Sequence, residues 1–177
     1  MKTRSLILTA LFAALTAVGA FLKIPFPLSA ITLQFFFTAM AGTLLGKKYG
    51  ALSQAVYVLL GLVGVPIFAL GGGFSYVFQP TFGFLLGLIP SAWVIGSLAR
   101  RPLTFWRSVT AMLAGLAVLY AIGVPYMALI ANAYLGKGLT FWQVFKNGML
   151  IYLPGDMLKI AAGSALSCAV TRRIPNL

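Results

Sequence analysis

Residues 108–134 read SVTAMLAGLAVLYAIGVPYMALIANAY and contain no charged side chain. A membrane-spanning helix needs about 20 predominantly apolar residues, and this stretch is longer than that. The rest of the 177-residue chain is similar, because 61% of its residues are hydrophobic, only 8% are charged, and its mean hydropathy is +1.01. Soluble chains are about 25% charged. The sequence therefore predicts a polytopic membrane protein.

Working outward from this stretch, we find five more apolar runs of nearly that length. The sequence predicts a single all-α transmembrane domain over residues 1–177, with spans at about 5–22, 28–46, 50–65, 80–99, 108–134 and 148–170. Glycine and proline lie at the joints between the runs. Pro125 is expected to kink the fifth helix, and Pro154 either interrupts the sixth helix or begins it.

The basic residues alternate between the joints. One side holds nine of the 13: Lys2, Arg4, Lys47, Lys48, Arg100, Arg101, Arg107, Arg172 and Arg173. The other side holds Lys23, Lys137 and Lys146, and Lys159 falls within a span. Because cytoplasmic connections retain Lys and Arg, we expect both termini in the cytoplasm of a bacterial inner membrane. A cleaved signal peptide over the first 22 residues is an alternative, but it would leave five spans and spoil the alternation.

The composition also limits the chemistry. The chain has one acid, one cysteine and no histidine, so it lacks the residues of paired carboxylates, Ser-His-Asp sets and Cys-His dyads. The same shortage leaves no plausible zinc or iron site. Its net charge of +12 lies in separated pairs and not in a patch with interleaved aromatics, which argues against nucleic acid. We expect no enzyme, no metal and no cofactor.

The most informative polar motif is YLPGDMLK at residues 152–159. Helical steps put Tyr152, Asp156, Lys159 and Gly163 on one face of the last apolar run. Ionisable residues at membrane depth usually face the interior of a bundle and line a ligand or ion pathway. The alternative is an ion pair that only holds helices together, although apolar residues usually serve packing better. A carboxylate beside an ammonium suits a small ligand with urea-like or amide-like N–H and C=O groups.

Two outward connections lack the polarity of solvated loops. Residues 65–79 carry no charge and hold four aromatic side chains around Gly71, Gly72 and Gly73, which predicts a segment folded back on the bundle, as a wall of a site or as a lid. Residues 23–34 end with Thr32 and Gln34 at the mouth of the second span. In the first span, Ala10, Ala13, Ala14 and Ala17 form a stripe of small residues that lets another helix approach closely, either within the bundle or from a second protein.

Four motifs, in this order and spacing, carry a resemblance to a known family: ITLQ at 31–34, GLVGVPIFA at 61–69, PTFGF at 80–84 and PGDMLK at 154–159. They resemble the BioY family, the biotin-specific S components of energy-coupling factor (ECF) vitamin importers. The resemblance implies six membrane helices and a biotin pocket near their outer ends, covered by the first and the third-to-fourth connections. It also implies partners, namely a transmembrane coupling protein (T component) and two cytoplasmic ATPases.

The resemblance implies that Asp156 and Lys159 contact the fused-ring head group of biotin. Pattern and resemblance together predict this ligand-binding set: Asp156, Lys159, Tyr152, Gln34, Thr32, Gly72, Gly73, Tyr76, Pro80 and Thr81. The chain departs from the family's glycine pattern at Gln79 and Phe82. The partner of the biotin carboxylate stays open between Lys159, Lys23, backbone N–H groups of the glycine run and water.

Three other functions are compatible with parts of the sequence. An S component for another vitamin would share the fold, a proton-coupled carrier would use Asp156 as its proton site, and a membrane scaffold would transport nothing. Carriers usually show internal repeats, which this chain lacks, and a scaffold leaves the polar stripe unexplained. The chain also lacks the phosphate-binding motif of ATPases, so energy for import must come from a partner.

Overall fold

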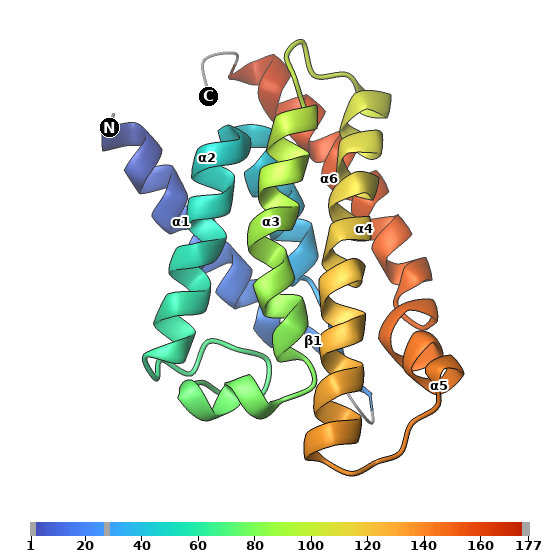
Figure 1. The fold of residues 1–177 in the computed structure, drawn as a ribbon. Helices are drawn as coiled ribbons and strands as arrows, with labels where there is room; N and C mark the ends of the chain where they lie inside the picture. The colour runs from blue at the N-terminus through green and yellow to red at the C-terminus, as the bar shows by residue number, and fades with distance from the viewer. Residues whose placement is uncertain (1–2, 27–28, 175–177) are drawn as a thin grey trace.

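The computed structural model describes residues 3–26 and 29–174. Most of this length is helical, and Figure 1 shows the long helices gathered into one bundle. The α-helices are α1 (Thr3–Phe21), α2 (Gln34–Leu62), α3 (Phe82–Leu98), α4 (Phe105–Leu129), α5 (Phe141–Phe145) and α6 (Leu153–Arg173). Three shorter helical segments are the 3₁₀-helix η1 (Phe74–Phe78) and the π-helices η2 (Ile130–Tyr134) and η3 (Lys146–Leu150).

A short β-hairpin connects α1 to α2 and corrects the predicted start of the second span. β1 (Lys23–Phe26) pairs antiparallel with β2 (Ser29–Thr32), so that Lys23 lies opposite Thr32. The described chain is therefore not purely α-helical, and the second helix begins at Gln34 and not at the predicted residue 28. The pairing explains the difference, because residues 29–32 lie in β2 and pair with β1 in place of a helical turn.

α2 is assigned as one element, but the chain reverses direction inside it. Gly46 is not helical (φ 76°, ψ 178°). On either side of it, Gln34 bonds to Tyr57, Thr38 bonds to Gln54, and a Cβ on Gly50 would lie 2.9 Å from Gly42. Residues at nearly equal distances along the chain from Gly46 therefore meet in pairs, as they do in an antiparallel helical hairpin. The first arm (34–45) and the second arm (47–62) correspond to the second and third predicted spans.

Pro154 determines where α6 starts. Pro154 lies in the first turn, where its missing N–H costs no helical hydrogen bond, so the prediction that the helix begins at this proline is confirmed. The preceding η3 belongs to the predicted span but has π-helical hydrogen bonding. α4 contains Pro125 and continues past it to Leu129.

The bundle has an apolar core that also holds buried polar groups, and large apolar side chains lie on its surface as well. Thr16, Thr38, Gln54 and several serines are fully buried and hydrogen-bonded to their neighbours. Large apolar side chains lie on the surface, including Val63 at 84% and Phe141 at 83% exposure. By length and composition, α1 and the Phe105–Tyr134 helix could each cross a membrane.

Candidate functional site

The first turn of α6 positions the single acid of the chain. Pro154 starts the helix, and the backbone N–H of Asp156 donates to the carbonyl oxygen of Tyr152 at 2.9 Å. The carboxylate points into the bundle, and the residue is only 5% exposed. At this end of a helix the free N–H groups and the helix dipole stabilise a negative charge. The start of α6 thus places the acid inside the bundle.

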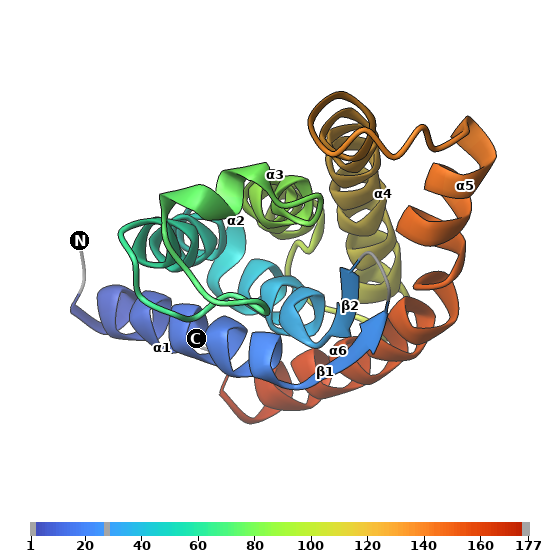
Figure 2. The ribbon, with the colours of Figure 1, turned by 90° about the horizontal axis from the view of Figure 1, so that it is seen from below.

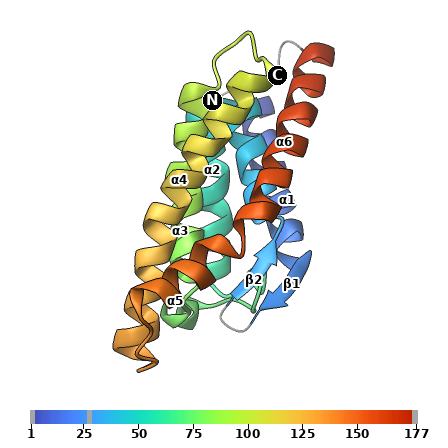
Figure 3. The ribbon, with the colours of Figure 1, turned by 90° about the vertical axis from the view of Figure 1, so that its right-hand side faces the viewer.

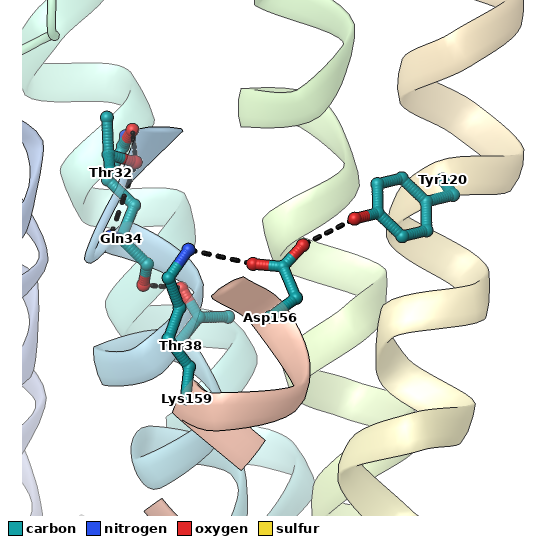
Figure 4. Close-up of polar contacts among 6 residues, drawn as sticks. All are labelled: Thr32, Gln34, Thr38, Tyr120, Asp156 and Lys159. Atoms are coloured by element: carbon teal, nitrogen blue, oxygen red, sulfur yellow. Dashed lines mark hydrogen bonds and ion pairs between the residues drawn. The ribbon is translucent and has the colours of Figure 1, made fainter. Parts of the chain in front are cut away.

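Two side chains from different helices hold this carboxylate (Figure 4). Lys159, one turn later on α6, donates from Nζ to Oδ1 of Asp156 at 2.7 Å, and the hydroxyl of Tyr120 on α4 donates to Oδ2. Both charged side chains are about nine-tenths buried. Removing either charge alone would leave the other uncompensated in a place that water barely reaches, which is costly.

A second polar group lies on α2. Thr32 donates to Oε1 of Gln34 at 2.8 Å, and Nε2 of Gln34 donates to the hydroxyl of Tyr57 at 2.8 Å. Tyr57 in turn donates to the carbonyl oxygen of Ile67 at 3.0 Å. Gln34 is thereby fixed between the hairpin, the second arm of α2 and the long connection to α3.

That connection, residues 63–81, folds back onto the bundle. Phe68 is 1% exposed and packs edge-on against Tyr57, with ring centroids 5.5 Å apart. Tyr76 is also buried, and this burial raises the pKa of its hydroxyl, while a hydrogen bond with Thr81 lowers it. The prediction of a folded-back segment agrees with this geometry. Phe74 and Phe78 are the exception, since both are exposed.

The glycines permit this path of the chain. A Cβ on Gly72 would lie 2.2 Å from the carbonyl oxygen of Val65, which no real side chain tolerates. Gly73 has φ +102°, a conformation that favours glycine, and its N–H donates to the carbonyl oxygen of Gly61 at 2.7 Å. Figure 2 views the bundle from the end at which this connection and the hairpin lie, and Lys23 joins them by donating to the carbonyl oxygen of Ala69.

These elements enclose a cavity between α2, α3, α4 and α6. Its empty volume is about 720 Å³, with the open solvent at its mouth included. Phe35, Phe84, Leu85, Leu88 and Leu119 form much of its apolar wall, and the polar groups described above converge on it. Lys159 is the one basic residue among the cavity-lining residues that the structure describes.

Seven of the ten predicted ligand residues line this cavity. They come from the hairpin, α2, the connection to α3, and the start of α6: Thr32, Gln34, Tyr76, Thr81, Tyr152, Asp156 and Lys159. Gly72, Gly73 and Pro80 are not among the lining residues in the described part of the chain. For the two glycines the structure gives a role in the path of the backbone, and ligand contact by all three stays a prediction.

Sequence reasoning missed Tyr120 and the apolar wall of α3 and α4. Tyr120 touches both the cavity and Asp156. A signal was present, since it is a polar side chain in the middle of the long apolar run 108–134, where an unsatisfied hydroxyl is costly. The aliphatic wall residues gave no signal, because they look like every other apolar residue of the spans.

The predicted alanine stripe lies elsewhere, along a second and shallower hollow. Ala10, Ala13, Ala14 and Ala17 face the second arm of α2 there, together with Tyr57 and Leu60. Ala13 is buried, whereas Ala10 and Ala14 are exposed. The stripe thus packs partly inside the bundle and leaves a groove open to the surroundings. We refer to it as the α1 groove.

The site is rich in hydrogen-bonding groups. Among residues 3–26 and 29–174, no three His, Cys, Asp or Glu side chains gather where they could hold a metal ion. The cavity instead combines an acceptor, Asp156, with the donors Lys159 and Tyr120, and adds the amide of Gln34. A neutral or anionic molecule with N–H and C=O groups matches these partners.

Comparison with known proteins identifies the relatives of this chain. A model described as the BioY family matches residues 1–176. "Probable biotin transporter BioY" of Lysinibacillus sphaericus is 45% identical over 167 residues, which cover 93% of this chain and 85% of the relative. "Biotin transporter BioY" of Thermotoga maritima is 45% identical over 165 residues, covering 93% of this chain and 94% of the relative.

The fold also has a solved counterpart. A crystal structure of the S-component for biotin from an ECF-type ABC transporter superposes with a TM-score of 0.83, covering 97% of this chain and 92% of that one. The two sequences are 22% identical, so this likeness concerns the fold.

Proposed function

The chain belongs to the BioY family, and we propose that it is the biotin-binding membrane subunit of a vitamin importer. Its relatives from two bacteria are named biotin transporters and match it over almost its whole length. The single observation that carries the proposal is the buried Asp156 with its two donors in a cavity that is otherwise lined mainly by apolar side chains. Import of an unchanged vitamin requires binding and release, so no enzymatic step, metal or cofactor is part of the proposal.

The cavity chemistry fits the head group of biotin. Its urea ring presents two N–H donors beside one C=O acceptor. Asp156 accepts an N–H group, Lys159 or Tyr120 donates to the oxygen, and the amide of Gln34 serves the other side. The apolar wall from α3 and α4 covers the sulfur-containing ring and the aliphatic chain. Gly72, Gly73 and Pro80 contribute by shaping the loop that covers the pocket.

The protein is a membrane protein, and we propose that it crosses the bilayer six times as one domain. The two arms of α2 then count as separate spans, together with α1, α3, α4 and α6. The interior holds buried polar side chains and the outside holds exposed apolar ones, which is the arrangement that a lipid solvent favours. Trp106, in the first turn of α4, and Trp142, in α5, are both exposed. Exposed tryptophans near the ends of membrane helices are typical of anchors at the membrane–water interface.

We assign the cytoplasmic side from the basic residues. Gly96, near the end of α3, packs against Gly46 and Lys47, so the turn of α2 lies beside the Arg100–Arg107 connection. Figure 3 has both ends of the described chain at this end of the bundle and the hairpin near the other. Both termini then lie in the cytoplasm of the bacterial inner membrane, and the biotin pocket opens outward.

Import against a gradient requires an energy source that this chain lacks. We propose that a T component and cytoplasmic ATPases supply it. The α1 groove is the surface that we assign to the T component, because its small residues allow a partner helix to approach closely in lipid.

Equilibrium binding of labelled biotin to the purified protein in detergent tests the function. We expect saturable binding that unlabelled biotin displaces and thiamine does not. Displacement by another vitamin but not by biotin would assign a different S-component ligand. A folded protein that binds no biotin would refute the proposal.

A further inference from the structure

Tyr120 approaches the site from a helix that the sequence motifs do not include. It is 8% exposed, lines the cavity, and its hydroxyl donates to Oδ2 of Asp156. Figure 4 shows it on the opposite side of the carboxylate from Lys159. The two oxygens of the carboxylate therefore face different donors, an ammonium at Oδ1 and a neutral phenol at Oδ2.

The position of this phenol is fixed by its surroundings. The ring of Tyr120 packs edge-on against Phe84, with centroids 6.4 Å apart and planes at 89°. A ring held in this way leaves the hydroxyl hydrogen one free motion, rotation about the C–O bond. Lys159, by contrast, carries a rotating ammonium on a flexible stem and can satisfy acceptors in many directions.

The remaining bonding capacity at Oδ2 matches one edge of a cyclic urea. A carboxylate offers about four acceptor positions, of which Lys159 and Tyr120 take two. In a cyclic urea, an N–H donor and the C=O acceptor lie side by side on one edge. Once the hydroxyl hydrogen of Tyr120 turns away from Oδ2 of Asp156, these two groups form the complementary pair of an acceptor next to a donor.

We propose that Tyr120 is a specificity-determining residue. On binding, its single hydroxyl hydrogen turns from Oδ2 of Asp156 to the carbonyl oxygen of the ligand's urea ring, and the neighbouring N–H of the ring takes its place at Oδ2. The inference rests on the proposed binding of biotin and deepens it. Because the phenol is fixed, it contributes only when the carbonyl oxygen lies directly beside the N–H. It therefore selects for the ureido oxygen itself.

This contact is tested by changing the ligand and the protein separately and together. Thiobiotin carries sulfur in place of the ureido oxygen, and sulfur accepts hydrogen bonds weakly. We expect the parent protein to bind thiobiotin about tenfold more weakly than biotin. In Tyr120→Phe, biotin affinity falls by about tenfold, and the preference for biotin over thiobiotin shrinks to about twofold or less.

The matched control is Tyr126→Phe on the same helix. Its hydroxyl donates to the carbonyl oxygen of Val77 at 2.6 Å, and it is not among the cavity-lining residues that the structure describes. This variant should keep the parent's preference for biotin. If Tyr120→Phe does not fold, Tyr120→Met carries the same test with another apolar side chain.

Several results would overturn the inference. Equal losses for both ligands in Tyr120→Phe leave the preference for biotin unchanged, and they would mean that the hydroxyl acts only by orienting Asp156 and does not contact the ureido oxygen. Absence of biotin binding by the parent would instead remove the proposed function itself. If the parent binds biotin and Tyr120→Phe leaves the preference over thiobiotin unchanged, only the proposed role of Tyr120 is refuted.

Discussion

Lys159 and Asp156 form the one ion pair in the described chain, and both side chains are nearly buried. We expect Lys159→Met to weaken biotin binding by about 10- to 150-fold, the equivalent of about 1.5–3 kcal/mol for a hydrogen bond to a charged group. The change removes a donor and leaves Asp156 with Tyr120 as its remaining partner. Lys146→Met is the matched control, because Lys146 is exposed and does not line the cavity within the described residues. Isothermal binding curves of both variants measure the difference.

The double change Asp156→Asn with Lys159→Met separates binding from architecture. It removes both buried charges at once, so thermal unfolding should take place closer to the parent's temperature than in Lys159→Met alone. Biotin affinity should stay low, because the ligand has lost its charged partners. A double variant that binds biotin as tightly as the parent would make the pair a structural feature.

At the scale of single residues, charge was the clearest signal in the sequence, and the structure brings Asp156 and Lys159 together in the cavity, while their contact with a ligand stays a prediction. An acid and a lysine three residues apart in an apolar run stand out wherever the ends of the membrane spans are placed. Tyr120 was missed because it is linked to Asp156 through space and not along the chain. The glycines were noticed, but a run of three does not reveal that Gly72 lies against the carbonyl group of Val65.

The connection between α2 and α3 gives a prediction at the scale of elements. Gly72→Ala places a methyl group 2.2 Å from the carbonyl oxygen of Val65, so the segment that carries Ala69, Leu70 and Tyr76 must move. Overpacking of this kind costs about 1–3 kcal/mol, and we expect biotin affinity to fall by about tenfold. Gly155→Ala is the control, because its added methyl would meet only Ile31, at 4.0 Å. Equal affinities of the two variants would show that the loop does not shape the pocket.

Helices were easier to predict than the links between them. Long apolar runs located α1, α3 and α4 to within a few residues, since nothing else satisfies backbone groups over such lengths in lipid. The hairpin escaped prediction because its residues are as apolar as those of a span. The reversal at Gly46 was anticipated by the lysines that follow it, although the joint was placed at Gly50.

For the whole molecule, the α1 groove predicts a separation of binding from transport. Ala14→Trp fills an exposed part of the groove, away from the cavity. We expect biotin affinity within about twofold of the parent and loss of most biotin uptake by the assembled importer, because a bulky side chain blocks close helix approach. Val18→Trp, on an exposed position of α1 that does not line the groove, should retain uptake. Loss of biotin binding in Ala14→Trp would place the stripe in the internal packing instead.

The orientation of the bundle is tested by single cysteines on a Cys168→Ala background. A cysteine at Lys137 or Phe74 should react with an impermeant thiol reagent in intact cells, and one at Arg101 only after lysis. The reverse pattern would mean that the protein has the opposite orientation in the membrane and that the pocket does not open outward.

The central claim is that Asp156 binds the head group of biotin, and the most direct measurement compares equilibrium biotin binding to the parent and to Asp156→Asn. Asparagine keeps the size and one acceptor but removes the ionised one, and it leaves Lys159 without its counter-charge. We expect saturable binding to the parent and an affinity about 10- to 150-fold lower in the variant, with its helical content intact. Equal affinities in two folded proteins would contradict the claim.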